Sequence, residues 1–127
     1  MQEQLIDFGF LREISGNDPE YMFEVIRIFL DSTPEGVKRL GEMIATGDSW
    51  DAVSKQAHSL KSSVSVIKIR GVYDHLAEIE NITRQKQEIN EDTKDKITQL
   101  FNTIVTTFAE AEPVLVEEMK KNKPVGE

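Results

Sequence analysis

A histidine and a lysine stand one helical turn apart in the stretch AHSLKSSV, residues 57–64. His58 supplies an imidazole and Lys61 an ammonium, and the other polar side chains of this stretch are short hydroxyls. A neutral imidazole is a good nucleophile toward phosphorus, and an ordinary imidazole, with a pKa of about 6.5, is largely neutral at pH 7. An ammonium within reach would pair with a phosphoryl group attached to the ring. These two residues therefore indicate phosphoryl chemistry.

The apolar residues around this stretch recur at spacings of three and four, which predicts an α-helix with His58 on its outer side. Each residue of an α-helix turns by about 100°. With His58 at zero, Lys61 falls at about −60° and Ser62 at about +40°, and the apolar seam is centred about 120° away. We therefore expect the ring to project from an exposed stripe beside the core. The candidate partner-docking residues on or beside this stripe are Ser54, Lys55, Ser62 and Ser65.

A simpler interpretation competes with this one. A surface histidine commonly has no function, a His–Lys pair arises often by chance, and each docking candidate alone could be ordinary solvated helix face. His75 provides a comparison within the same chain: Asp74 and Glu78 lie beside it and would repel a phosphoryl group, so we expect it to have a structural or surface role. His58 and His75 share no metal-ligand spacing and the chain has no cysteine, so we expect no metal site.

Composition limits the classes of partner. The chain has 127 residues, enough for one domain with a sizeable core, and a formal net charge of −8, which makes free nucleic acid and anionic membranes poor partners. No apolar run approaches the roughly 18 residues that span a bilayer, and the start MQEQLIDFGFLREI lacks the layout of a secretory signal. Together with the absence of cysteine, these features predict a cytoplasmic protein without membrane insertion.

Helical periodicity dominates the chain, and no segment alternates convincingly like a strand. Asp18, before Pro19, is a natural helix cap, Asp48 or Ser49 caps the helix that carries His58, and Asn90 caps the last helix. The β-branched stretch VSVIKIRG weakens the helical pattern around residues 66–71.

Two prolines leave the limits of the longest helices open. Pro34 either starts a new helix after Thr33 or kinks a long one, and Pro113 should bend or interrupt the last helix. The sequence predicts an all-α domain, an antiparallel four-helix bundle with short N-terminal helical additions. We place this domain at residues 1–120, followed by a flexible tail at 121–127.

The stretch AHSLKSSV, within WDAVSKQAHSLKSSVSVIKI, resembles the signature of histidine-containing phosphotransfer (HPt) domains, which is roughly A-H-x-L-K-G-S/A. LREISGNDPEYMFEVIRIFLDSTPEGVKRL resembles the family's opening, and VYDHLAEIEN resembles the helix after the active histidine, in which a Leu and a Leu/Ile-Glu pair recur. The resemblance covers most of the chain. It implies a helical bundle whose exposed histidine accepts a phosphoryl group from the aspartyl phosphate of a receiver domain. The group then passes to another receiver, within a multistep two-component phosphorelay.

The resemblance assigns roles by position. His58 would be the phosphorylated residue, forming a phosphohistidine at Nε2, and Lys61 would help to neutralise the phosphate. Ser62 stands where the family usually has a glycine, so we expect an altered partner preference rather than inactivity. Lys68 stands near where many members have another glycine, which leaves the turn between the two helices uncertain.

The chain contains no G-x-x-x-x-G-K-S/T loop and no kinase glycine motif. It is therefore expected to be a phosphocarrier rather than an enzyme, without a cofactor of its own. The resemblance implies that the partners are response-regulator receiver domains, among them that of a hybrid sensor kinase, and that the receiver supplies Mg²⁺.

Three other interpretations compete with this one. The chain could be a silent HPt-like adaptor that binds signalling proteins without transferring phosphate. It could be the phosphoacceptor hairpin of a sensor kinase, but that family follows its histidine with an acidic residue, and Ser59 stands there. It could also be an acidic helical bundle in which AHSLK occurs by coincidence.

Overall fold

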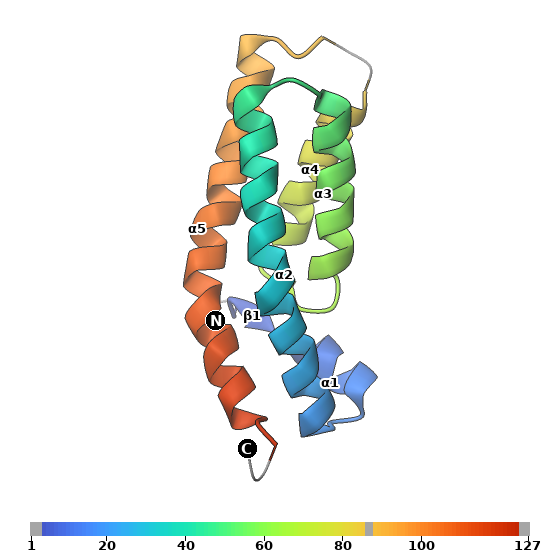
Figure 1. The fold of residues 1–127 in the computed structure, drawn as a ribbon, viewed down its shortest axis with the longest axis vertical. Coiled ribbons are helices and arrows are strands. Elements are labelled where there is room, and N and C mark those ends of the chain that lie inside the picture. Colours follow the sequence, from blue (N-terminus) through green and yellow to red (C-terminus); the bar gives the residue numbers. More distant parts are fainter. Residues whose placement is uncertain (1–3, 86–87, 125–127) are drawn as a thin grey trace.

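The computed structural model describes residues 4–85 and 88–124, and helices account for most of this part of the chain (Figure 1). The long helices run along the long axis of the molecule, and successive long helices run in opposite directions. In chain order the elements are β1 (Ile6–Asp7), α1 (Gly9–Ser15), α2 (Pro19–Thr46), α3 (Trp50–Val64), β2 (Lys68–Ile69), α4 (Val72–Arg84) and α5 (Glu91–Lys121).

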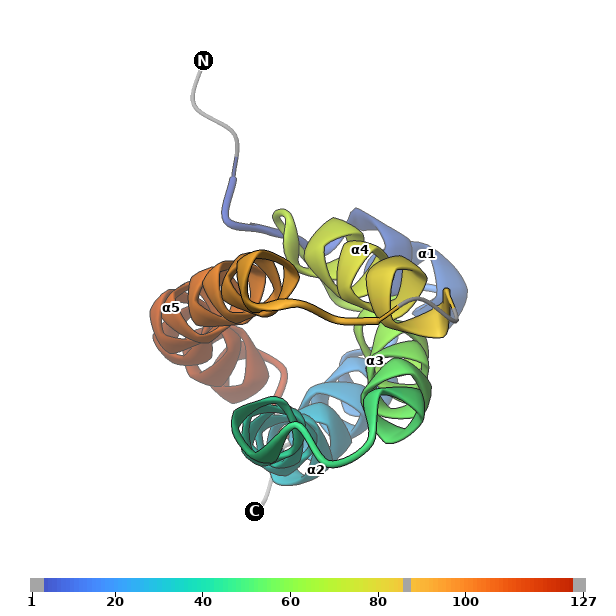
Figure 2. The same ribbon diagram turned by 90° about the horizontal axis from the view of Figure 1, so that it is seen from above.

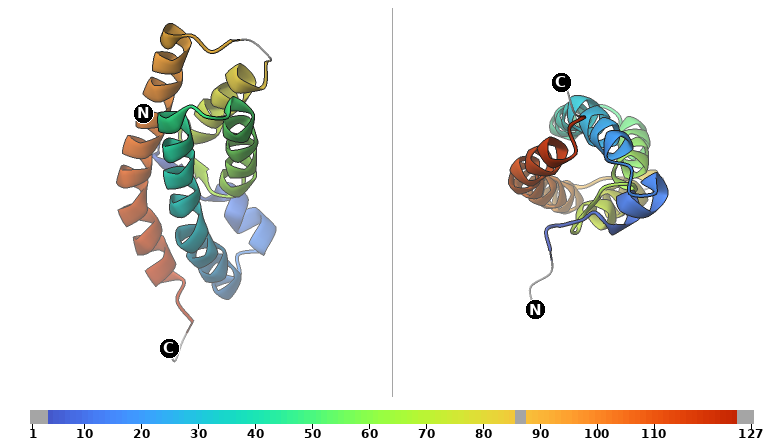
Figure 3. Two further views of the ribbon diagram at one scale, coloured as in Figure 1. Left: turned by 45° about the horizontal axis from the view of Figure 1, so that its top comes forward. Right: turned by 90° about the horizontal axis from the view of Figure 1, so that it is seen from below.

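Helices α2, α3, α4 and α5 form an antiparallel bundle, which confirms the predicted fold class. Seen along the bundle, they occupy four corners, with α3 and α4 on one side and α2 and α5 on the other (Figure 2). The additional helix α1 packs at the end of the bundle where α2 begins (Figure 3). Helix α5 continues to Lys121, one residue past the expected domain boundary, and residues 125–127 of the expected tail lie outside the described residues.

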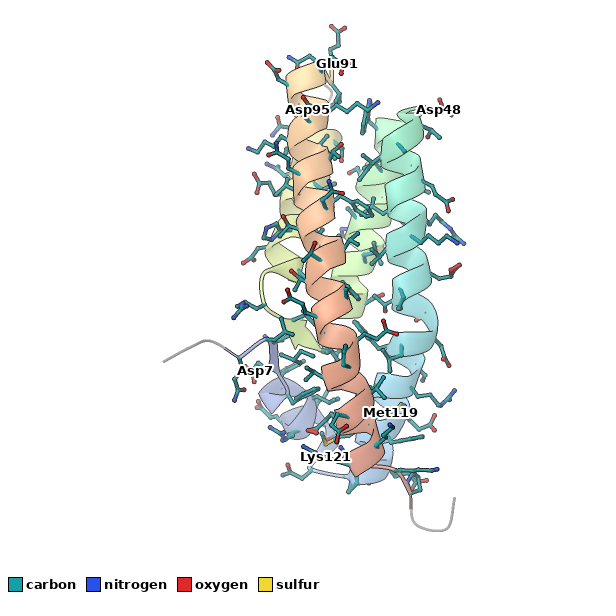
Figure 4. The ribbon with its side chains drawn as sticks, turned by 90° about the vertical axis from the view of Figure 1, so that its left-hand side faces the viewer. Asp7, Asp48, Glu91, Asp95, Met119 and Lys121 are labelled. Atoms are coloured by element: carbon teal, nitrogen blue, oxygen red, sulfur yellow. The ribbon has the colours of Figure 1, made fainter. Side chains whose placement is uncertain are left out.

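Polar side chains at the predicted caps explain where the helices begin. Asp18 accepts a hydrogen bond from the backbone N–H of Glu20 at 3.1 Å, and Asn90 accepts one from that of Thr93 at 2.9 Å. Of the two candidates before α3, Ser49 is the cap. At α5, acidic residues lie near the start and lysines at the end, as the helix dipole favours; Figure 4 labels Glu91, Asp95 and Lys121.

Both prolines lie inside continuous helices. Pro34 is within α2, which settles the choice left open at this position, and Pro113 is within α5, which is not interrupted there. Both residues are exposed, so the ring and the missing hydrogen bond fall on the outer side of each helix. Buried residues on either side, such as Thr33 and Val37 in α2, hold the helix on the core across the proline.

The paired strands β1 and β2 were not predicted. They are antiparallel, with Ile6 opposite Ile69, and the backbone N–H of Arg70 donates to the carbonyl of Leu5 at 2.8 Å. Strand β1 precedes α1 in the N-terminal region, where the sequence predicted only helical additions, and β2 lies in the β-branched stretch that weakened the helical pattern. The pair fastens the N-terminal segment to the loop between α3 and α4.

The apolar faces of the helices meet in one core. Phe29 is buried there and its ring stacks on that of Phe108, whereas Trp50, Phe101 and Phe108 are half-buried at its margin. No helix in the described ranges combines the length and the hydrophobicity that crossing a bilayer requires. The largest side chains that are almost completely buried are Leu11, Ile26, Leu40, Ile67, Leu76, Ile79, Ile97, Ile104 and Leu115.

Candidate functional site

The His58 side chain projects from the middle of α3 and is 66% exposed. Its Nδ1 lies 2.9 Å from Oε2 of Glu80, a residue of α4. The ring lies on the outer side of its helix, as the sequence predicts. The structure adds a carboxylate that holds one ring nitrogen.

Lys61 shares this carboxylate. Its Nζ lies 2.7 Å from the other oxygen of Glu80, Oε1, and 5.6 Å from the centroid of the Tyr73 ring. The Lys61 side chain is only 20% exposed, because it lies along the contact between α3 and α4. One glutamate thus positions both the imidazole and the ammonium.

Packing explains why Glu80 has these partners. It lies one residue after the buried Ile79 on the side of α4 that faces α3, and its side chain is only 10% exposed. A carboxylate largely removed from water needs charged or hydrogen-bonded partners. The hydrogen bond from Lys61 holds the pKa of Glu80 below its ordinary value, against the opposing effect of burial, and the contact with His58 acts in the same direction as Lys61.

The contact with Glu80 also determines which ring nitrogen can react. An ionised carboxylate only accepts hydrogen bonds, so the hydrogen of a neutral His58 ring lies on Nδ1. The lone pair is then on Nε2. An arrangement in which Nδ1–H is oriented by an acceptor leaves Nε2 as the nucleophilic atom.

The prediction that Ser54 belongs to the exposed stripe is wrong. Ser54 is buried, and its hydroxyl lies 3.5 Å from the backbone oxygen of Glu80. The physical reason is the direction of the core: on the helical wheel Ser54 falls at about −40°, on the side of His58 nearer the apolar seam. Helix α4 covers that side of α3, so Ser54 contributes to the contact between the two helices.

The other three docking candidates are exposed. Lys55 pairs with Asp51 across one helical turn at 3.0 Å, and the two side chains are largely in solvent. Ser65 caps the C-terminal end of α3, and its hydroxyl donates to the carbonyl of Ser62 at 2.7 Å. Whether Lys55, Ser62 and Ser65 contact a partner stays a prediction.

His75 has a structural contact, in line with the expectation for it. Its Nδ1 hydrogen-bonds to the carbonyl of Gly71, and the residue is half-buried in the first turns of α4. Gly71 has a φ of 80°, in the left-handed region that favours glycine, and it turns the chain from β2 into α4. The bond from His75 supports this turn.

Sequence reasoning missed Glu80 and Tyr73. Glu80 belongs to the Ile-Glu pair of VYDHLAEIEN, which contributed to the resemblance but received no role. Tyr73, near the start of the same helix, also received none.

An apolar hollow of about 580 Å³ lies between α2 and α5, across the bundle from Glu80 and Tyr73. In the described part of the chain, no group of three or more histidine, cysteine or carboxylate side chains could hold a metal ion.

Comparison with known proteins gives one match. Residues 24–111, more than half of the chain, match the family model of the Hpt domain. The matched range contains His58, Lys61, Tyr73 and Glu80. No curated protein and no solved structure matches the chain.

Proposed function

Because the chain belongs to the Hpt domain family, we propose that His58 is its phosphoacceptor in a multistep two-component phosphorelay. Hpt domains are phosphocarriers that take part in histidine phosphotransfer, and they generally interact with receiver domains. In our proposal His58 accepts the phosphoryl group from the aspartyl phosphate of one receiver and passes it to the aspartate of another. A hybrid sensor kinase would contain the first receiver, and the reaction takes place in the cytoplasm.

The contact of Glu80 with both His58 and Lys61 is the observation that supports this proposal most strongly. The Nδ1–H···Oε2 hydrogen bond, at 2.9 Å, orients the ring with Nε2 as the nucleophile. Lys61 is one turn away and provides a cation for the phosphoryl oxygens. This arrangement supplies a nucleophile, a group that orients it and a charge that stabilises the product.

The transfer step balances within this arrangement. The lone pair on Nε2 forms the N–P bond as the P–O bond to the receiver aspartate breaks, and the aspartate leaves as a carboxylate with that electron pair. The ring keeps the hydrogen on Nδ1 and becomes a cation, which the negative charge of Glu80 stabilises at 2.9 Å. The return transfer to the second receiver reverses these changes.

The receiver would supply Mg²⁺ and the acidic pocket that holds it. Glu80 is the carboxylate that contacts His58, and both of its oxygens already have partners, His58 and Lys61. The residues around His58 therefore do not fit a magnesium site of this chain. In the proposed reaction they provide the nucleophile, its orientation and one cation.

Incubation of the protein with a phosphorylated receiver and Mg²⁺ tests the proposal. We expect the wild type to take up an acid-labile, base-stable label, the His58→Gln variant to take up none, and the His75→Gln control to label like the wild type. Label that persists in His58→Gln would show that another residue is the acceptor. A wild type that binds receivers but takes up no label from several of them would favour the adaptor.

A further inference from the structure

We propose that Tyr73 is a positioning residue for the phosphoryl transfer, acting through the ammonium of Lys61. This inference rests on the proposed function of His58 and deepens it. It starts from an exposed aromatic side chain for which packing offers no reason: Tyr73 is 45% exposed and lies outside the core, yet its ring contacts the functional lysine.

Tyr73 and Glu80 lie seven residues apart, so they occupy the same face of α4 about two turns from each other. The Nζ of Lys61 contacts both, at 5.6 Å from the ring centroid of Tyr73 and 2.7 Å from Oε1 of Glu80. The ring therefore holds the ammonium from one side and the carboxylate holds it from the other. The flexible Lys61 side chain, with its four methylene groups, is thereby confined to the contact between α3 and α4 beside His58.

The two partners act differently on the charge of Lys61. Glu80 neutralises it, and a phosphoryl group on His58 must compete with that ion pair for the ammonium. The Tyr73 ring attracts the cation through its quadrupole and leaves the net positive charge intact. Tyr73 can therefore keep Lys61 at the site while its ammonium moves from the carboxylate to the phosphoryl oxygens.

The surroundings of Tyr73 are open to a docking receiver. The ring borders a hollow of about 780 Å³, whose lining also includes Ser65 and Lys68. Ser65 lies on the same stripe of α3 as His58, so a receiver above the imidazole would approach this hollow as well. Covering the ring would remove water from the cation–π contact, and such contacts strengthen when they are desolvated. Docking would then hold Lys61 more firmly.

The chain offers a matched control for this contact. Lys68 Nζ lies 5.2 Å from the ring centroid of Phe10, which is 38% exposed. This second lysine–aromatic pair joins β2 to α1 rather than α3 to α4. Phe10→Leu should therefore remove a contact of the same kind without affecting Lys61.

The contact itself can be measured without any phosphoryl transfer. The ring current of Tyr73 should shift the NMR signals of the Lys61 methylene groups nearest the ammonium upfield. We expect Tyr73→Phe and Phe10→Leu to keep this shift and Tyr73→Leu to abolish it. Identical Lys61 signals in the wild type and Tyr73→Leu would overturn the inference.

Transfer from a phosphorylated receiver tests the role. Tyr73→Leu should lower the single-turnover rate about threefold to tenfold, in keeping with the strength of cation–π contacts, whereas Tyr73→Phe and Phe10→Leu should stay near the wild type. In a Lys61→Met background, Tyr73→Leu should have no further effect, because its action passes through Lys61. A general effect on folding or docking would lower the rate equally in both backgrounds.

The outcomes separate the two proposals. A labelled wild type whose rate is unchanged in Tyr73→Leu, or lowered equally in both backgrounds, overturns the role of Tyr73 and leaves His58 as the acceptor. A wild type that takes up no label overturns the proposed function, and the positioning role with it, even if the ring-current shift is present. Because Tyr73 is exposed, Tyr73→Leu should fold, and circular dichroism checks this.

Discussion

The carboxylate of Glu80 gives the site its geometry at the scale of single residues. One oxygen fixes the tautomer and orientation of His58 and the other holds Lys61, so the two functional groups are not independent. A change at either partner leaves a largely buried carboxylate with one contact fewer, which costs stability in addition to any effect on the proposed transfer. The transfer rates of Lys61 variants should therefore be compared with that of the wild type under conditions in which the same fraction of each protein is folded.

Stability in acid should depend on Glu80. Its pKa in the folded protein lies below the ordinary value of 4.5, chiefly because of the hydrogen bond from Lys61. The ionised carboxylate therefore contributes its full stabilisation above pH 4.5, and this contribution is lost as the pH falls through the lowered pKa. Glu80→Gln should lower the free energy of unfolding by about 1–3 kcal/mol at pH 7, with a difference from the wild type that shrinks toward pH 3.

Urea unfolding at a series of pH values measures this difference. Glu78→Gln is a suitable control, because Glu78 lies on the same helix with its side chain 44% exposed and pairs with Lys96 at 3.1 Å. A difference between wild type and Glu80→Gln that stays constant from pH 7 to pH 3 would show that the ionised Glu80 carboxylate does not stabilise the fold.

The sequence predicted where His58 and Lys61 lie, but it missed the residues that hold them in place. The spacing within α3 is enough to place His58 outward and Lys61 one turn away. Glu80 is 22 residues from His58 in the chain, and its role depends on how α4 is rotated against α3. Helical periodicity alone predicts only that Glu80 is a polar residue beside the apolar face of α4. Ser54 was expected to be exposed for the same reason. The helical wheel of α3 alone cannot show which side of that helix α4 covers.

At the scale of elements, α2 continues through Pro34. This continuity predicts a different effect of replacing the proline than a separate helix that begins after Thr33 would. A proline inside a helix removes one backbone hydrogen bond, here the one to the carbonyl of Leu30, at a cost of about 3 kcal/mol. Pro34→Ala should restore this bond and raise the free energy of unfolding by about 1–2 kcal/mol, since the greater freedom of the unfolded chain offsets part of the gain.

Denaturant unfolding of Pro34→Ala, with Pro113→Ala as the parallel variant in α5, measures the effect. If Pro34 instead began a separate helix after Thr33, its missing N–H would cost nothing and alanine would be neutral or destabilising. A decrease in stability of Pro34→Ala would therefore contradict a continuous α2.

The paired strands β1 and β2 are too short to be predicted from the sequence. Ile67 and Ile69 are buried while Lys68 and Arg70 are exposed, which is the alternation of a strand. With only two residues in β2, this alternation is too short to separate from a loop. The antiparallel partner lies more than sixty positions earlier in the chain, so only the folded structure brings it into view.

At the scale of the whole molecule, the bundle separates two faces. Helices α3 and α4 carry His58 and Glu80, and α2 and α5 line the apolar hollow. These two pairs of helices lie on opposite sides of the bundle (Figure 2). The antiparallel arrangement itself could be predicted from sequence, because each helix has one apolar face and the connections are short. The position of the hollow could not be predicted in this way, because it depends on how the small and aromatic side chains of α2 and α5 pack against each other.

This separation predicts that a receiver contacts one face only. Ser62→Arg places a long side chain four residues from His58 on the exposed stripe and should raise the KM for the phosphorylated receiver about tenfold or more, because it blocks close approach to the imidazole. Val105→Arg introduces the same side chain on α5, where Val105 is 43% exposed and borders the hollow, and should leave the KM unchanged. Equal increases in both variants would mean that charge rather than position limits docking. An increase in Val105→Arg alone would place the receiver on the opposite side of the bundle, too far from His58 for direct transfer.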